Sequence, residues 1–135
     1  MSTTKTKRQA VKKRTLRSRA GKVVVIKSGP ALKTWRQGRG IPRPLFARIA
    51  DCSERTLATY EASPRLPVKF SRPVTESVRL IQALEELAGD NTALKEWLQK
   101  PNPAFDRRAP LSLIQNGEVD VLWSMVHQIR QGAFA

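Results

Sequence analysis

Apolar residues recur every three or four positions through the second half of this chain, and this spacing is the strongest constraint on its fold. Between residues 74 and 88 they lie on one helical face, at Val74, Val78, Ile81, Leu84 and Ala88. The pattern repeats near the end of the chain, at Val119, Leu122, Val126 and Ile129. Steps of three and four residues are typical of an α-helix, whereas a half-buried strand alternates in steps of two. Both segments are therefore predicted to be amphipathic helices, over residues 74–88 and 118–131.

Prolines, glycines and capping residues set the limits of five shorter helices. Their predicted ranges are 31–37, 42–50, 53–61, 92–99 and 110–115. Gly89 ends the helix over 74–88, Asp90 or Asn91 caps the next one, and Pro110 stands in a first turn, where proline is tolerated. Residues 22–27 (KVVVIK) favour a short extended segment, but no second run of this kind is present to pair with it. The predicted fold class is all-α.

Composition divides the chain into three regions. Residues 1–30 form a basic arm that we expect to be disordered, because it lacks the apolar residues needed to offset the entropy of ordering it. Residues 31–73 hold three predicted helices and end in a proline-rich linker over 62–73, which we expect to be extended. Residues 74–135 form a second helical module.

The charge is concentrated at the N-terminal end. The chain has 25 Lys and Arg against 11 Asp and Glu, a net charge of +14, and residues 1–30 contain ten basic residues and no acidic one. Nucleic acid is the first partner that this charge suggests, and an anionic membrane is the second. The arm is either a nucleic-acid contact that acts through phosphate attraction or a solubilising tail. No lipidation motif or amphipathic basic helix supports membrane contact.

Several function classes are excluded by what the sequence lacks. The single cysteine, Cys52, rules out an internal disulfide and offers no second thiol for a zinc site. No apolar run approaches the roughly 18 residues that cross a bilayer, so we expect a cytoplasmic protein without a membrane partner. There is no glycine-rich phosphate loop, no nucleophile beside a histidine and no recognisable carboxylate pair. We therefore expect no enzymatic activity, no cofactor and no catalytic or metal-binding residue.

Residues 42–61 resemble a helix-turn-helix of the Xre or lambda-repressor type. The resemblance rests on Phe46 and Ala47 in the first helix, Asp51 and Cys52 in the turn, then Ser53, Leu57 and Glu61. Ala47 is small where the two helices cross, Ser53 caps the second helix and Leu57 anchors it to the core. Asp51 replaces the usual turn glycine, although aspartate tolerates a left-handed conformation.

The resemblance implies which side chains face DNA. The N-terminal part of the second helix enters the major groove in such motifs, so the candidates for contact with bases or nearby phosphates are Ser53, Glu54, Arg55, Thr56 and Thr59. Arg55 has the donors to bind guanine with two hydrogen bonds. Arg43 begins the preceding helix, where a phosphate contact is expected. We interpret Arg36, Arg39 and Arg48 as solvated surface.

The second module resembles the C-terminal module of the MbcA/ParS/Xre antitoxins. The resemblance begins with residues 97–105 (WLQKPNPAF) and continues through Ala109-Pro110-Leu111, Leu113-Ile114, Gly117 and the last amphipathic helix. It implies the antitoxin of a type II toxin-antitoxin system. Such an antitoxin covers the active site of a RES-fold toxin, which consumes or transfers from NAD, and represses its own operon by binding operator DNA. A larger toxin-antitoxin complex is implied as well, and a homodimer is expected because helix-turn-helix motifs usually read two half-sites about one helical turn apart.

In the family, the last helix and the terminal segment lie against the toxin. The corresponding residues here are Trp123, Val126, His127, Arg130, Gly132, Ala133, Phe134 and Ala135. The apolar spacing favours the core for Val126, as it does for Val119, Leu122 and Ile129, and it leaves Trp123 open between core and interface. An alternative function is that of a phage- or plasmid-type transcription regulator without a toxin, whose second module serves only dimerisation.

Overall fold

The computed structural model describes residues 24–132, and this part of the chain contains helices and no strand. The predicted all-α class is confirmed. The helices are α2 (Gly29–Gly38), α3 (Arg43–Ile49), α4 (Glu54–Glu61), α5 (Val68–Ala88), α6 (Asn91–Gln99), the short 3-10 helix η1 (Pro103–Phe105), α7 (Pro110–Gln115) and α8 (Val119–Arg130). Residues 24–27 form neither helix nor strand, and the start of the predicted extended segment lies outside the described residues.

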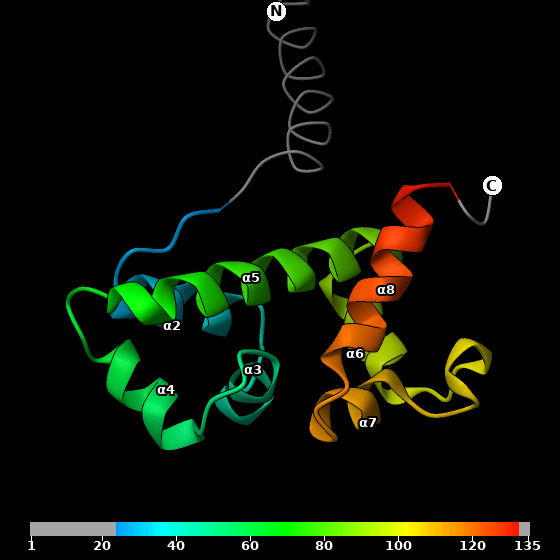
Figure 1. The fold of residues 1–135 in the computed structure, drawn as a ribbon, viewed down its shortest axis with the longest axis horizontal. Helices are drawn as coiled ribbons and strands as arrows, with labels where there is room; N and C mark the ends of the chain where they lie inside the picture. Colours follow the sequence, from blue (N-terminus) through cyan, green and yellow to red (C-terminus); the bar gives the residue numbers. More distant parts are fainter. Residues whose placement is uncertain (1–23, 133–135) are drawn as a thin grey trace, which may run out of the picture.

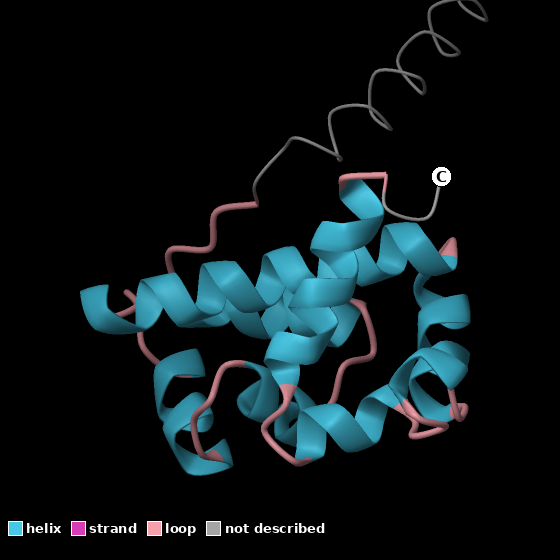
Figure 2. Cartoon of the chain, turned by 45° about the vertical axis from the view of Figure 1, so that its right-hand side comes forward, coloured by secondary structure: helices cyan, strands magenta, loops and turns pink. Residues whose placement is uncertain are grey.

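Helix α5 is the long element that joins the two halves of the molecule (Figure 1). The helices α2, α3 and α4 lie towards its first half, and α6, α7 and α8 lie towards its last turns. Helix α4 packs on α2 and α3, while α5 contacts α6 and α8. Helix α7 contacts α3, α6 and α8, so it forms a second connection between the halves. Figure 2 shows the described part of the chain as helices joined by loops, with no strand.

One continuous apolar core runs through both halves. Leu32, Phe46 and Leu57 are fully buried in the first half, and Leu113 and Leu122 are fully buried in the second. All five belong to the same cluster of packed side chains. Because the buried face of α5 contributes to the core along its whole length, the two groups of helices are held together by packing as well as by the chain.

The predicted caps and stops occur where the sequence placed them. The side chain of Ser53 accepts a hydrogen bond of 3.0 Å from the Thr56 amide, and that of Asp90 accepts one of 2.8 Å from the Ala93 amide. Gly89 follows α5 with a φ of 113°. Such side-chain caps satisfy amide groups that have no partner within the helix.

The predicted linker over residues 62–73 is too long, because α5 begins at Val68 and contains Pro73. Phe70 is 5 % exposed and its ring lies 4.1 Å from that of Tyr60, while Val74 is fully buried. Burying two such side chains contributes about 1.5–3 kcal/mol each, which offsets the cost of about 3 kcal/mol for an internal proline. Tertiary packing therefore extends the helix through a residue that local rules treat as a breaker.

Candidate DNA and toxin interfaces

Helices α3 and α4 form the two helices of the predicted helix-turn-helix. Ala47 is buried between them, and Leu57 is fully buried on the inner face of α4. The turn is closed by a hydrogen bond of 2.9 Å from the Cys52 amide to the Ala47 carbonyl. Asp51 has a φ of 58°, the left-handed conformation that the motif requires at this point. The geometry of the turn therefore fits the motif despite the absence of glycine.

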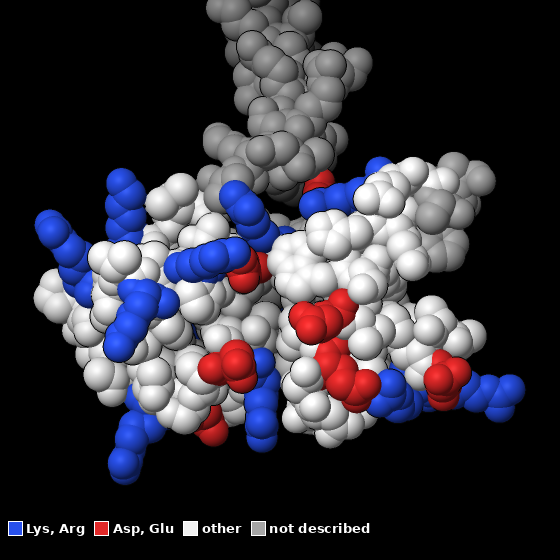
Figure 3. All heavy atoms as spheres, in the orientation of Figure 1, with Lys and Arg blue, Asp and Glu red and all other residues white. Residues whose placement is uncertain are grey.

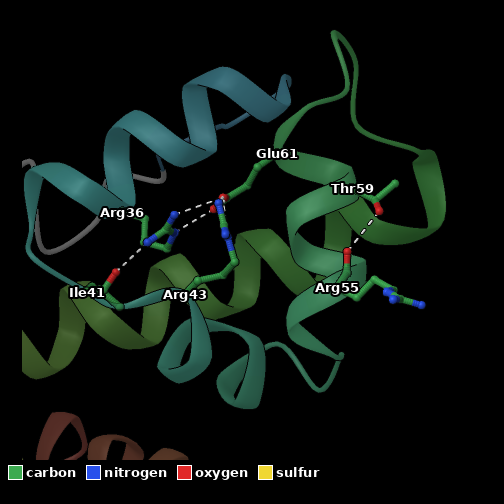
Figure 4. A network of polar contacts seen from close by, with 6 residues as sticks. All are labelled: Arg36, Ile41, Arg43, Arg55, Thr59 and Glu61. Carbon is green, nitrogen blue, oxygen red and sulfur yellow. Dashed lines mark hydrogen bonds and ion pairs between the residues drawn. The ribbon is translucent and has the colours of Figure 1, made fainter.

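The predicted DNA contacts on α4 lie on the outer side of the helix. Ser53, Glu54, Arg55 and Thr59 are exposed, and Thr56 is half-buried. The Ser53 hydroxyl also donates to the Thr56 hydroxyl at 2.9 Å, and the Thr59 hydroxyl donates to the Arg55 carbonyl at 3.0 Å. The Arg55 side chain points away from the other helices (Figure 4). Arg55 therefore presents a long cationic side chain on this face, where a ligand can reach it.

Behind this face, Glu61 forms ion pairs with two arginines in a buried cluster (Figure 4). Arg36 donates to both carboxylate oxygens, through Nε at 2.6 Å and Nη2 at 3.0 Å, and its Nη1 donates to the Ile41 carbonyl at 2.9 Å. Arg43 donates to Oε1 through Nε and Nη2, both at 3.1 Å. The cluster joins α2, the loop before α3, α3 and α4.

The charges of this cluster do not cancel. Two guanidinium groups face one carboxylate, which leaves a net charge of +1, and the Arg43 side chain is 36 % exposed while that of Glu61 is 2 % exposed. Burial alone would raise the pKa of Glu61, but the hydrogen bonds and charges of Arg36 and then Arg43 outweigh it and hold the pKa below its ordinary value. The surplus positive charge therefore lies on Arg43, at the start of α3.

The interpretation as solvated surface is wrong for Arg36 and holds only in part for Arg39, which is half-buried. Arg36 is 5 % exposed and inside the Glu61 cluster. Arg39 lies 4.3 Å above the Trp35 ring and makes a 3.2 Å ion pair with Glu85, which also accepts a 3.0 Å hydrogen bond from Asn91. Partners 25 and 46 residues away in sequence neutralise these cations, and no local pattern shows such pairs. Arg48 is exposed, as expected.

The predicted toxin contacts on α8 and directly after it fall into three groups. Val126 is fully buried and its side chain belongs to the core, as its apolar spacing indicates, so it offers no surface to a partner in this structure. Trp123 is half-buried, and its ring stacks at 5.5 Å on that of the exposed His127. Arg130 and Gly132 are exposed, with Arg130 only 3.8 Å from Glu86. The tail residues 133–135 lie outside the described part of the chain.

Between the halves lies a cleft of about 1030 Å³. Its walls come from α3, the start of α4, α5, α6 and α7, and apolar side chains such as Leu45, Ile81 and Leu94 line it. Cys52 also lines the cleft, where burial and then the nearby Asp51 charge raise the pKa of its thiol. A thiol of this kind stays protonated at neutral pH and is a poor nucleophile.

Basic and acidic side chains are unevenly distributed over the surface (Figure 3). Lys and Arg stand out at the end of the molecule formed by α4 and the start of α5, where Arg55, Arg65, Lys69 and Arg72 are exposed. Acidic side chains are more frequent over the middle and the opposite end. Within residues 24–132, no helix is long and apolar enough to cross a membrane, and no group of three His, Cys, Asp or Glu side chains is placed to hold a metal ion.

The second half of the molecule matches a known family. Residues 83–122 match the family described as the antitoxin Xre/MbcA/ParS C-terminal toxin-binding domain. The match begins within α5, before the Trp97 segment that carries the resemblance in the sequence, and it ends at Leu122 in α8. The predicted resemblance to the MbcA/ParS/Xre antitoxins is therefore confirmed.

Similarity to individual relatives agrees with the family match. The chain is 25 % identical over 87 residues to the mycobacterial cidal antitoxin MbcA of Mycobacterium tuberculosis and of Mycobacterium bovis, an overlap that covers 64 % of this chain and 76 % of each relative. No solved structure matches the fold. Together, the family match and the relatives support a toxin-antitoxin protein of the antitoxin kind, with a toxin-binding domain.

Proposed function

We propose that this chain is the antitoxin of a type II toxin-antitoxin system, which neutralises a RES-type toxin by covering its active site and represses its own operon by binding operator DNA. The observation that carries the proposal is the match of residues 83–122 to a toxin-binding domain, in a chain whose other half has the geometry of a helix-turn-helix. A repressor of this kind acts in the cytoplasm, where its operator lies.

The arrangement around Glu61 supports DNA binding. Arg36 and Glu61 fix the end of α4 to α2, so the outer face of α4 is presented by a rigid base. Arg43 is held by two hydrogen bonds and still exposes part of its guanidinium. A cation fixed in advance at a helix N-terminus loses little entropy when it binds phosphate. Helix-turn-helix proteins commonly read two half-sites about one helical turn apart, so we propose a homodimer on the operator.

Replacing Arg55 with alanine is expected to weaken binding to the operator by about 1–3 kcal/mol, because a bidentate contact to a base is lost. Binding to random DNA should change much less. The measurement is a titration of the labelled promoter fragment upstream of this gene and of a scrambled fragment of equal length, at fixed salt. Arg107→Gly is the matched control, since it removes the same charge in the other half. Equal losses on both fragments would exclude base recognition by Arg55.

The toxin partner is tested by co-expression with the neighbouring reading frame. We expect that frame to encode a RES-type protein, to be toxic alone and to co-purify with this chain. The enzyme's NAD turnover should stop when the complex forms, because the active site is covered. A neighbouring frame of another kind, with full DNA binding by this chain, would favour a transcription regulator without a toxin.

A further inference from the structure

We infer that residues 102–108, here called the Asn102 loop, form a second toxin-contacting surface, in which Arg107 binds a carboxylate of the toxin. The inference rests on the proposed antitoxin function and adds a surface that lies apart from the last helix and the tail. It follows from three observations on this loop: its fixed conformation, its unusual backbone and its position.

The Asn102 loop is held in one conformation by its own hydrogen bonds. The Asn102 side-chain oxygen accepts a hydrogen bond from the Ala104 amide at 2.9 Å. The backbone carbonyl of Asn102 accepts hydrogen bonds from the Phe105 and Arg107 amides, both at 2.9 Å. The Asn102 amide in turn donates to the Arg108 carbonyl at 3.1 Å. Phe105 is buried and its ring meets that of Trp97 edge to face at 6.2 Å. The loop is therefore pre-organised, which reduces the entropy lost on binding.

Two consecutive residues of the loop adopt a backbone conformation that favours glycine. Asp106 has a φ of 54° and Arg107 a φ of 65°. Aspartate tolerates this conformation, but arginine is strained there, and glycine at position 107 would make the same turn at a lower cost. The sequence nevertheless places two charged side chains at these positions, and both are exposed. Strained residues such as Arg107 cluster at binding surfaces, which indicates a use for its side chain.

The position of the loop fits a partner of the second half. It lies in the middle of the matched segment 83–122, whereas the tail and all of α8 after Leu122 lie beyond that segment. Arg108 donates to Glu118 at 2.7 and 3.2 Å, which ties the loop to the start of α8. In Figure 1 the loop stands out at the end of the molecule opposite α4, and the end of α8 points elsewhere. A toxin bound here leaves the DNA-binding face uncovered.

Arg107 determines the chemistry of the partner group. Arg108 already has an acidic partner, Glu118, while Arg107 has none among the hydrogen bonds and ion pairs of the described residues. A planar guanidinium on a rigid loop is suited to a bidentate pair with a carboxylate. We therefore assign Arg107 to an Asp or Glu on the toxin surface.

The test is Arg107→Gly in the full chain, with binding to the purified product of the neighbouring reading frame measured by calorimetry. Glycine relieves the backbone strain while it removes the side chain, so stability and binding should separate. We expect the melting temperature to be no lower than that of the wild type and the affinity for the toxin to fall about tenfold or more. Arg107→Glu should bind more weakly still. Arg55→Ala is the control, expected to bind the toxin as the wild type does.

Each outcome discriminates between the two proposals. Unchanged affinity of Arg107→Gly, with normal binding by the wild type, would overturn the loop assignment and leave the antitoxin proposal intact. Binding by Arg107→Glu at or above the wild-type level would overturn the carboxylate partner. If the wild-type chain itself fails to bind the neighbouring protein, the proposed function fails and the loop assignment fails with it.

Discussion

Replacing Glu61 with alanine is expected to lower the free energy of unfolding by about 3–5 kcal/mol, since it breaks a buried ion pair and leaves an uncompensated buried charge. Arg36 is 5 % exposed and would keep only its hydrogen bond to the Ile41 carbonyl. Domains of this size are typically stable by about 5–15 kcal/mol, so the loss is a large part of the total. Urea unfolding followed by circular dichroism measures it.

A matched control lies on the same helix. Glu54 also belongs to α4 but is exposed and has no ion pair in the described residues, so Glu54→Ala should change stability by less than about 1 kcal/mol. Arg43→Ala should cost less than Arg36→Ala, because Arg36 still neutralises the carboxylate when Arg43 is gone. A Glu61→Ala effect as small as that of Glu54→Ala would show that the cluster does not hold the helices together.

The same carboxylate predicts acid sensitivity. Its pKa lies below the ordinary value in the folded chain, so its contribution to stability is complete above the unfolded pKa of about 4.3 and is lost as the pH falls through the folded pKa. We expect the stability difference between the wild type and Glu61→Gln to shrink as the pH is lowered from 6 to 3. Unfolding curves at several pH values measure this difference, and a difference that grows towards acid would contradict the direction of the pKa shift.

Local signals in the sequence predict most of the helices, because they depend on neighbours in the chain. The cap at Ser53, the left-handed turn at Asp51 and the end of α5 at Gly89 follow from the preferences of single residues. The start of α5 does not follow from them. Phe70 packs on Tyr60, a contact across the turn between α4 and α5, and this contact outweighs the rule that a proline such as Pro73 ends a helix.

In the candidate sites too, features that depend on neighbours in the chain could be predicted, and features that depend on distant contacts could not. The exposed face of α4 could be predicted, since one buried position, Leu57, determines which side faces out. The roles of Arg36 and Glu61 could not, because charge gives no information on a partner 25 residues away. On α8, apolar spacing alone leaves core and interface unresolved: Val126 is fully buried while Trp123, three residues earlier, is half-buried.

Removing the last three residues, Ala133, Phe134 and Ala135, is expected to abolish protection from the toxin while DNA binding stays intact. In the proposed complex the terminal segment lies in or over the toxin active site, and Phe134 is the one large apolar side chain after α8 ends at Arg130. Leu122 and Val126, which anchor α8 to the core, precede the cut, so the fold should survive. Cells that express the toxin with the truncated chain should survive no better than cells with the toxin alone.

A single substitution at Phe134 tests whether protection depends on the chemistry of this side chain or on the length of the tail. Phe134→Asp should act like the truncation, because an apolar contact is replaced by a charge that must be desolvated, whereas Phe134→Leu should protect largely as the wild type does. His127→Ala, which removes an exposed side chain from α8, tests whether the helix itself contributes. Full protection by the truncated chain would show that the inhibitory contact lies on another surface, such as the Asn102 loop, and not on the tail. Arg107→Gly in the full-length chain would then be the variant that loses protection, since the inhibitory contact would lie on the loop.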